Sequence, residues 1–248
     1  MKVNIIMAAF NQWDMSERSI KSILKNTNLD YRLIFINNGS TDNTHDMFME
    51  KFSDNDNITY LRAEKNGGCG IGRNIGLRKL DDDCEFVILV DNDIYAPDGW
   101  AEKMVAVMTA HPKLGIGGAA TNFAGTPQLI PNVPPLETDE EIEEYSRNHS
   151  FPKEFIIVPP RWTVIGFCQI VRRELYDTVG LFDEEFKLYG CEDNDFCLRS
   201  QMAGWHLAYI NSVFVYHDGH GGLSQLGADG SSQWGKNREY FKKKHGFI

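Results

Sequence analysis

The segment 85–95, EFVILVDNDIY, decides the fold that we expect for this chain. Its run of five apolar residues, 86–90, is typical of a strand buried on both faces, as in a parallel sheet covered by helices. The run leads directly into Asp91 and Asp93, and residues two apart in an extended chain point to the same side. We therefore expect both carboxylates beyond the carboxyl end of a central strand, where open α/β sheets bind ligands.

The two carboxylates of this segment indicate a site for a divalent cation. Paired anionic oxygens at a sheet edge suit Mg²⁺ or Mn²⁺ bound together with the phosphates of a substrate. The alternative is a polar turn that only ends the strand, because the D-x-D pattern is common in proteins.

Composition narrows the class of protein. The chain has 248 residues, of which 42% are hydrophobic and 24% charged, and its net charge is −10. An acidic chain without a long basic block is poorly suited to binding nucleic acid. No apolar run approaches the roughly 20 residues that span a bilayer, and five scattered cysteines without a CxxC pair favour reduced thiols. We expect a cytoplasmic protein without an integral membrane segment, and peripheral contact with a membrane stays open.

Strands and helices alternate four times in the first part of the chain. Strands are expected at 2–9, 31–36, 58–61 and 86–90. Asp14 or Ser16 is expected to cap the first helix, and the glycine-rich loop 66–72 is expected to precede a helix at 73–80. Short links between alternating elements predict a parallel sheet with right-handed crossovers.

The second part has a looser pattern. We expect, in chain order, a helix at 99–110, a strand at 114–120, a surface excursion with one short helix at 125–160, a strand at 163–171, helices at 172–179 and 192–203, strands at 206–210 and 213–216, a flexible loop at 217–222 and a polar helix at 235–244. The whole chain, 1–248, is then one domain. It divides into a nucleotide-binding half (1–98), an acceptor and catalytic half (99–225) and a C-terminal helix (226–248).

An ordered series of motifs covers about residues 3–225: IIMAAFNQ, INNGSTDNT, NGGCGIGRNIGL, VDND, GFCQIVRRELYDTVGLFDEEF, GCEDNDFCLR, AGW and VYHDGHGGLS. Each motif alone is weak, but the ordered series resembles the family-2 glycosyltransferases of the GT-A fold. The similarity is greatest to bacterial enzymes that build surface polysaccharides, including rhamnosyltransferase-like members. The resemblance implies a Rossmann-like, mostly parallel central sheet flanked by helices.

The resemblance also implies a reaction. A metal-dependent, inverting transfer would move a sugar from a nucleoside diphosphate to an acceptor hydroxyl, with Mn²⁺ or Mg²⁺ as cofactor. A UDP-sugar is the favoured donor, with dTDP or GDP donors as alternatives. The acceptor would be a glycan, a lipid-linked sugar or a protein.

Roles follow from the resemblance position by position. The residues implied to bind nucleotide or donor are Ala8, Phe10, Asn11, Asn38, Arg73, Asp91 and Asn92. Asn38 stands where the family usually has an aspartate that binds the base. This departure leaves the identity of the base open, although an amide can also donate and accept hydrogen bonds.

The resemblance assigns the metal and the base to the remaining motifs. Asp93 would bind the metal directly, Asp91 would contact ribose or metal-bound water, and His217 would complete the site, with His220 as its competitor. Asp193 would be the general base, in the first turn of a helix where the dipole favours its ionised form. Glu192 and Trp162 are expected on the acceptor side.

Two other functions remain open. A nucleotidyltransferase also pairs carboxylates with Mg²⁺, although the glycine-rich basic loop expected after its first strand is absent here. A non-catalytic carbohydrate-binding module would need no metal–diphosphate site. A Rossmann dehydrogenase is disfavoured, because Ile75 occupies the third glycine position of G-x-G-x-x-G and the loop follows the third strand instead of the first.

Overall fold

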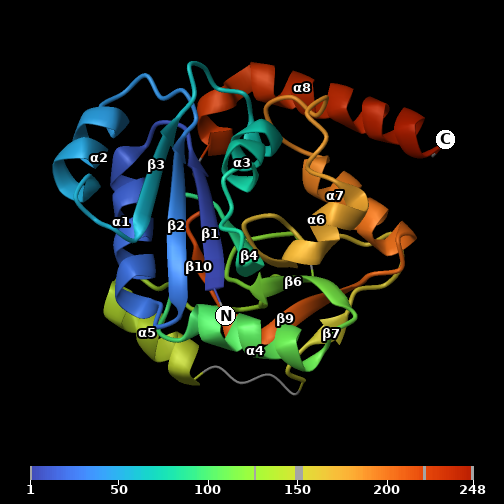
Figure 1. Ribbon diagram of the computed structural model, residues 1–248, viewed down its shortest axis with the longest axis horizontal. Helices are drawn as coiled ribbons and strands as arrows, with labels where there is room; N and C mark the ends of the chain where they lie inside the picture. The colour runs from blue at the N-terminus through green and yellow to red at the C-terminus, as the bar shows by residue number, and fades with distance from the viewer. Residues whose placement is uncertain (1, 126, 149–152, 220–221, 247–248) are drawn as a thin grey trace.

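The computed structural model describes residues 2–125, 127–148, 153–219 and 222–246 (Figure 1). The strands in these ranges are β1 (Lys2–Ala9), β2 (Asp30–Asn37), β3 (Ile58–Arg62), β4 (Cys84–Val90), β5 (Ile94–Tyr95), β6 (Leu114–Ala120), β7 (Ile156–Ile157), β8 (Cys168–Arg172), β9 (His206–Phe214) and β10 (Tyr216–His217). The helices are α1 (Trp13–Asn26), α2 (Thr44–Phe52), α3 (Cys69–Leu77), α4 (Trp100–Ala110), α5 (Asp139–Asn148), α6 (Arg173–Val179), α7 (Glu192–Met202) and α8 (Gly222–His245). None of the helices in the described ranges combines the length and the apolar character that crossing a membrane requires.

One eight-stranded sheet runs through both halves of the chain, in the order β3-β2-β1-β4-β8-β6-β9-β7. The first four strands are parallel neighbours, which confirms the alternation predicted for the first part of the chain. Strand β8 runs antiparallel between β4 and β6, whereas β6 and β9 are again parallel. A separate ribbon pairs β5 with β10. The sheet is therefore mixed but mostly parallel.

Alternate residues of the central strands pack into two cores on opposite faces of the sheet, as the period of a strand requires. Val3, Ile5 and Met7 of β1 lie in the core beneath α1, α2 and α4. Ile6 of the same strand lies in the core beneath α3, α6 and α7. Figure 1 shows α1 and α2 on one side of strands β1–β3 and α3 on the other. Both faces are covered, so the central strands are mostly apolar, and the few polar side chains in them, such as Asn4 and Gln169, are buried.

The predicted cap of the first helix is wrong. Helix α1 begins at Trp13, its N-cap is Gln12 with a φ of 58°, and no side chain caps it. The hydroxyl of Ser16 instead lies 3.4 Å from the carbonyl oxygen of Gln12 and accepts a bond from the amide of Asn92. Ser16 is fully buried, and its hydroxyl joins α1 to the turn after β4.

Helix α3 begins at Cys69, inside the loop that was expected to end at residue 72. Gly68, with a φ of 91°, turns the chain, and the N–H of Gly72 already donates to the Gly68 carbonyl. A Cβ atom on Gly72 would lie 3.0 Å from that of Ala8. The glycines therefore bring the first turn of a helix close to the end of β1.

The strand predicted at 163–171 is shorter, because regular pairing starts only at Cys168. In the preceding residues, side chains take the place of strand partners. Arg73 donates to the carbonyl of Gly166, and Asp193 accepts from the Gly166 N–H. These bonds draw the backbone out of the sheet.

Three further elements differ from expectation. The two strands predicted at 206–216 form one strand that ends at Phe214, followed by β10. Helix α8 begins at Gly222 instead of 235. The excursion 125–160 packs back onto the first half through Ile142, which is fully buried, and Glu143, which accepts bonds from Asn26 and Tyr95.

Candidate active site

A cavity of about 530 Å³ lies at the carboxyl ends of β1, β2 and β4, where the predicted site residues were expected. Its lining comes from the ends of these strands and the turns after them, from the loop before α3 and α3 itself, from the segments after β6 and before β8, from residues 188–190 and the start of α7, and from β10 and the residues after it. The lining residues are Ala8, Phe10, Asn38, Asn66, Gly68, Cys69, Arg73, Asp91, Asn92, Asp93, Phe123, Ala124, Gly125, Ile165, Gly166, Phe167, Leu188, Tyr189, Gly190, Glu192, Asp193, His217 and Gly219. Residues from both halves of the chain therefore face one space.

Asp91, Asp93 and His217 come together at one edge of this cavity. One ligand atom from each lies within 4.8 Å of the others, and Nε2 of His217 is 3.2 Å from Oδ1 of Asp93. This places the two carboxylates on one side of the chain, as their spacing predicted. His220, the competing histidine, lies outside the described residues.

The β5–β10 ribbon brings His217 to the carboxylates. His217 pairs with Ile94 across the ribbon, and the N–H of the next residue, Asp218, donates to the Asp93 carbonyl at 2.9 Å. Nδ1 of His217 lies 2.7 Å from the carbonyl oxygen of Phe123, so this nitrogen carries the proton. Nε2 faces Asp93 and would be the nitrogen that gives its lone pair to a bound cation, with the ring then neutral.

The charges of the site act on His217. Burial lowers its pKa, but the hydrogen bond and charge of Asp93, together with the charge of Asp91, raise it by more, so the pKa lies above its usual value. The ring also stacks on Phe167, with centroids 5.0 Å apart. Its orientation is fixed by partners on both edges and on one face.

Arg73 links the D-x-D carboxylates to the start of α7. Its side chain is only 5% exposed, and Nη2 donates to Oδ1 of Asp91 at 2.9 Å and to the carbonyl of Gly166 at 2.8 Å. Nη1 lies 3.8 Å from Oε1 of Glu192. Burial raises the pKa of Asp91, and the Arg73 guanidinium opposes this rise. Arg73 thus places a positive charge near the carboxylates of Asp91, Glu192 and Asp193.

Asp193 lies in the first turn of α7 and faces the cavity. Its Oδ2 accepts from the N–H of Gly166 at 3.2 Å, and its Oδ1 accepts from the N–H of Asn194 at 2.7 Å. Burial raises the pKa of Asp193, while Arg73 and these two bonds lower it, and the net shift is upward. A held carboxylate with a raised pKa has the properties of a general base.

Glu192, predicted on the acceptor side, is almost fully buried beside Asp193. Burial, followed by the charge of Asp193, raises the pKa of Glu192 to about 7. Its Oε2 has no hydrogen-bond partner among the described residues. Glu192 and Asp193 thus differ in environment, because Glu192 is buried whereas Asp193 is partly exposed.

Most of the residues predicted to bind the nucleotide line the cavity, but one of them does not. Ala8, Phe10 and Asn38 line the cavity. The amide of Asn38 donates to Asn66 and to the Gly68 carbonyl, so it also holds the glycine-rich loop. Asn11 does not line the cavity.

Asn11 and Asn92 organise the turns that surround the site. Oδ1 of Asn11 accepts from the N–H of Thr41 at 2.8 Å, which joins the turns after β1 and β2. Asn92 lines the cavity and donates to Ser16 of α1. Both asparagines thus fix backbone that carries cavity residues.

The exposed indole of Trp162, predicted on the acceptor side, is not part of the cavity lining. Sequence reasoning missed the wall formed by Leu188 and Tyr189, and the lining residue Phe123. Leu188 and Tyr189 could have been predicted to line the site, because they lie shortly before the acidic first turn of α7. Phe123 had none, because it lies in the irregular segment after β6.

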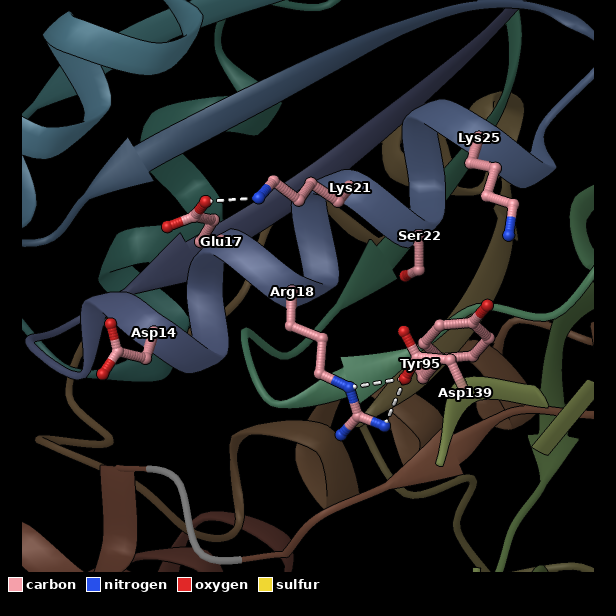
Figure 2. A pocket seen from close by; sticks show the side chains of 8 residues that line it. All are labelled: Asp14, Glu17, Arg18, Lys21, Ser22, Lys25, Tyr95 and Asp139. Carbon is pink, nitrogen blue, oxygen red and sulfur yellow. Dashed lines mark hydrogen bonds and ion pairs between the residues drawn. The ribbon is translucent and has the colours of Figure 1, made fainter. Parts of the chain in front are cut away.

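A second, smaller cavity of about 310 Å³ lies along α1, away from the D-x-D site. Figure 2 shows Arg18 reaching from α1 to Asp139, and the two side chains lie 2.8 Å apart. Arg18 also pairs with Asp218, the neighbour of His217, at 3.2 Å. Arg18 is thus paired with two acidic residues, and its ion pair with Asp218 links α1 to the residue that follows β10.

Comparison with known proteins places the chain in a class. A model of glycosyl transferase family 2 matches residues 4–180, and the chain belongs to this family. Chondroitin synthase of Escherichia coli is 24% identical over 212 residues, which cover 76% of this chain and 30% of that protein. The N-acetylglucosaminyl-diphospho-decaprenol L-rhamnosyltransferase of Mycobacterium tuberculosis is 23% identical over 237 residues, covering 86% of this chain and 75% of that protein. This chain spans less than two thirds of the length of several such relatives.

Solved structures show the same fold. TarS of S. aureus in complex with UDP-GlcNAc superposes with a TM-score of 0.62 at 19% identity, over 87% of this chain and 58% of that chain. The mannosyltransferase PcManGT of Pyrobaculum calidifontis, in complex with GDP-Man and Mn²⁺, superposes with a TM-score of 0.64 at 16% identity, over 87% and 56% of the two chains. The predicted GT-A fold is confirmed.

Proposed function

We propose that this chain is a metal-dependent, inverting glycosyltransferase that moves a sugar from a nucleoside diphosphate to an acceptor hydroxyl. The observation that carries the proposal is the convergence of Asp91, Asp93, His217 and Asp193 on one cavity. The family match ends at residue 180, so the roles of His217 and Asp193 are supported by geometry and by the motif resemblance.

The side chains at the end of β4 fit a divalent cation. Two carboxylates and one imidazole are ligands of Mn²⁺ and also accommodate Mg²⁺, and the nitrogen ligand favours Mn²⁺. These three side chains would hold the cation and would leave it open to the oxygens of a diphosphate. The bound cation would act as a Lewis acid that stabilises the charge developing on the leaving diphosphate.

Asp193 would accept the proton of the acceptor hydroxyl. Its carboxylate is held by the N–H groups of Gly166 and Asn194 and faces the same cavity as the metal ligands. The raised pKa brings its basicity closer to neutral pH, where a general base works best. A base and a metal-bound leaving group on opposite faces of the donor sugar would invert its anomeric carbon.

A UDP-sugar is the favoured donor, and dTDP and GDP donors are the alternatives. Ala8, Phe10 and Asn38 form the part of the cavity nearest the ends of β1 and β2, where the base and ribose would lie. The acceptor would be a glycan, a lipid-linked sugar or a protein. The remaining wall, which includes Tyr189 and Glu192, would contact the acceptor or the transferred sugar.

A donor screen tests this function. Purified protein is incubated with UDP-, dTDP- and GDP-sugars, with Mn²⁺, with Mg²⁺ or with EDTA, and release of nucleoside diphosphate is measured. We expect slow, metal-dependent hydrolysis of one donor class and thermal stabilisation by the same nucleotide. Release of pyrophosphate from a nucleoside triphosphate would favour a nucleotidyltransferase. Carbohydrate binding without metal-dependent nucleotide binding would favour a binding module.

A further inference from the structure

The buried side chain of Asn237 on α8 holds the backbone that leads into α7. Its Nδ2 lies 2.9, 2.9 and 3.0 Å from the carbonyl oxygens of Lys187, Tyr189 and Gly190, so its two N–H groups serve three acceptors and one of these bonds is shared. Its Oδ1 accepts from Gln233, one turn earlier on α8. Three carbonyls converging on one amide nitrogen need a hydrogen-bond donor, and Asn237 is only 1% exposed.

The segment held by Asn237 has an unusual backbone. Leu188, Gly190 and Cys191 all have positive φ angles, of 55°, 91° and 70°. A non-glycine residue in the left-handed region costs free energy, so outside contacts must maintain this conformation. Gly190 is also in close contact with α8, because a Cβ atom there would lie 2.5 Å from Cδ1 of Trp234.

The same segment reaches across the cavity to the glycine-rich loop. Leu188 and Tyr189 line the cavity, and the carbonyl of Leu188 accepts from the N–H of Cys69 at 2.7 Å. The chain then continues through Cys191 directly into Glu192 and Asp193. A shift of this segment would therefore move both a cavity wall and the proposed base.

Helix α8 is itself fastened to α7. Asp195, fully buried and two residues beyond the proposed base, accepts from Lys244 at 2.6 Å and from His245 at 2.8 Å. Asp183 pairs with Tyr240 and Lys244 of the same helix. Figure 1 shows α8 lying along the side of the molecule that carries α7. The ion pairs at the C-terminal end of α8 and Asn237, about two turns earlier, give this helix two points of attachment.

We propose that Asn237 is a positioning residue that sets the location of Asp193 by holding the carbonyls of 187, 189 and 190. Asn237 does not line the cavity, and it acts on the reaction through the backbone. This inference rests on the proposed function, in which Asp193 is the general base.

Two substitutions test this role. Asn237→Asp keeps the shape of the side chain but turns carboxylate oxygens toward three carbonyl oxygens, and Asn237→Ala removes the donor without adding charge. Lys236→Ala, at the exposed neighbouring position of α8, is the matched control. We expect kcat to fall about 10- to 100-fold in both Asn237 variants, because small misplacements of reacting groups have effects of this size. The affinity for nucleotide with Mn²⁺ should stay within about twofold, and the control should match the wild type.

Amide hydrogen exchange of the Cys69 N–H supplies a readout that needs no activity. This amide donates to the carbonyl of Leu188, which lies in the segment that Asn237 holds, and it should exchange faster in both Asn237 variants than in Lys236→Ala. Unchanged exchange, an unchanged kcat in folded variants, or equal losses of kcat and nucleotide affinity would overturn the proposal. If the wild type transfers no sugar, the proposed function fails, while the exchange experiment still decides whether Asn237 holds the segment.

Discussion

Nε2 of His217 lies 3.2 Å from Oδ1 of Asp93, although the two residues come from opposite halves of the chain. The contact depends on the short ribbon of β5 and β10, which pairs His217 with Ile94. The carbonyl of Phe123 fixes the other ring nitrogen. A metal site with these residues therefore requires β10 in place.

Removing this histidine should weaken metal binding. In His217→Ala, one nitrogen ligand is lost while both carboxylates remain. We expect the affinity for Mn²⁺ in the presence of UDP to fall by at least about tenfold, since even residues behind a ligand have effects of 10- to 100-fold. Isothermal titration calorimetry measures this. His206→Ala, at an exposed position of β9, is the control, and equal affinities in both variants would mean that His217 is not a ligand.

Removing the basicity of Asp193 should slow transfer without loss of donor binding. Asp193→Asn keeps a side chain of the same size next to the Gly166 N–H. We expect kcat to fall about 10²–10⁴-fold, the usual contribution of a general base, with nucleotide affinity nearly unchanged. Asp82→Asn, at an exposed position, controls for the loss of one charge. A near-normal kcat in folded Asp193→Asn would rule out this residue as the base.

Glu192 should make the folding stability of the protein depend on pH. Its pKa of about 7 in the folded state exceeds the ordinary value of 4.5, so the folded protein keeps a proton that the unfolded chain loses between these values. Stability is therefore lost as pH rises from about 4.5 to 7, by on the order of 3 kcal/mol.

Glu192→Gln is uncharged at every pH and should lack this loss. We expect the variant to have a flatter stability profile and to exceed the wild type in free energy of unfolding at pH 8. Urea unfolding of both proteins at several pH values between 5 and 8 measures the difference. Parallel profiles for the two proteins would show that Glu192 already ionises near its ordinary pKa.

Gly68 and Gly204 allow backbone strain to be separated from steric clash. Their φ angles are 91° and 90°, but a Cβ atom on Gly68 would lie 2.4 Å from the Leu188 carbonyl oxygen, whereas nothing lies within 4 Å at Gly204. Gly204→Ala should cost only the left-handed strain, about 1–2 kcal/mol. Gly68→Ala should cost about 1–3 kcal/mol more and should also lower activity.

Chemical denaturation gives both values, and a donor-hydrolysis assay reports on the cavity wall. The clash at Gly68 would displace Leu188, which lines the cavity, so only Gly68→Ala should affect nucleotide turnover. Equal stabilities for the two variants would mean that the backbone of Leu188 can move away from a Cβ atom at position 68 at little cost in free energy.

Much of the first half could be predicted from the sequence because its signals are local. The apolar run 86–90 and its counterparts predict buried parallel strands, and the paired carboxylates follow from the two-residue period of a strand. The predicted boundaries of strands were wrong where the backbone bonds to side chains instead of to a neighbouring strand. Residues 163–167 leave the sheet because Arg73 and Asp193 bond to Gly166, a contact between segments far apart in the sequence.

The sequence by itself determined the alternating α/β class, the position of the D-x-D pair at a strand end and the acidic first turn of α7. Only the tertiary structure decided that β8 enters the sheet antiparallel, that β10 brings His217 to Asp93, and that Asn237 of α8 holds the segment before Asp193. The physical reason is that periodicity and turn chemistry act between near neighbours in the chain. Contacts between distant segments instead depend on how whole elements pack. The local pattern of a single sequence does not show which of these segments will meet.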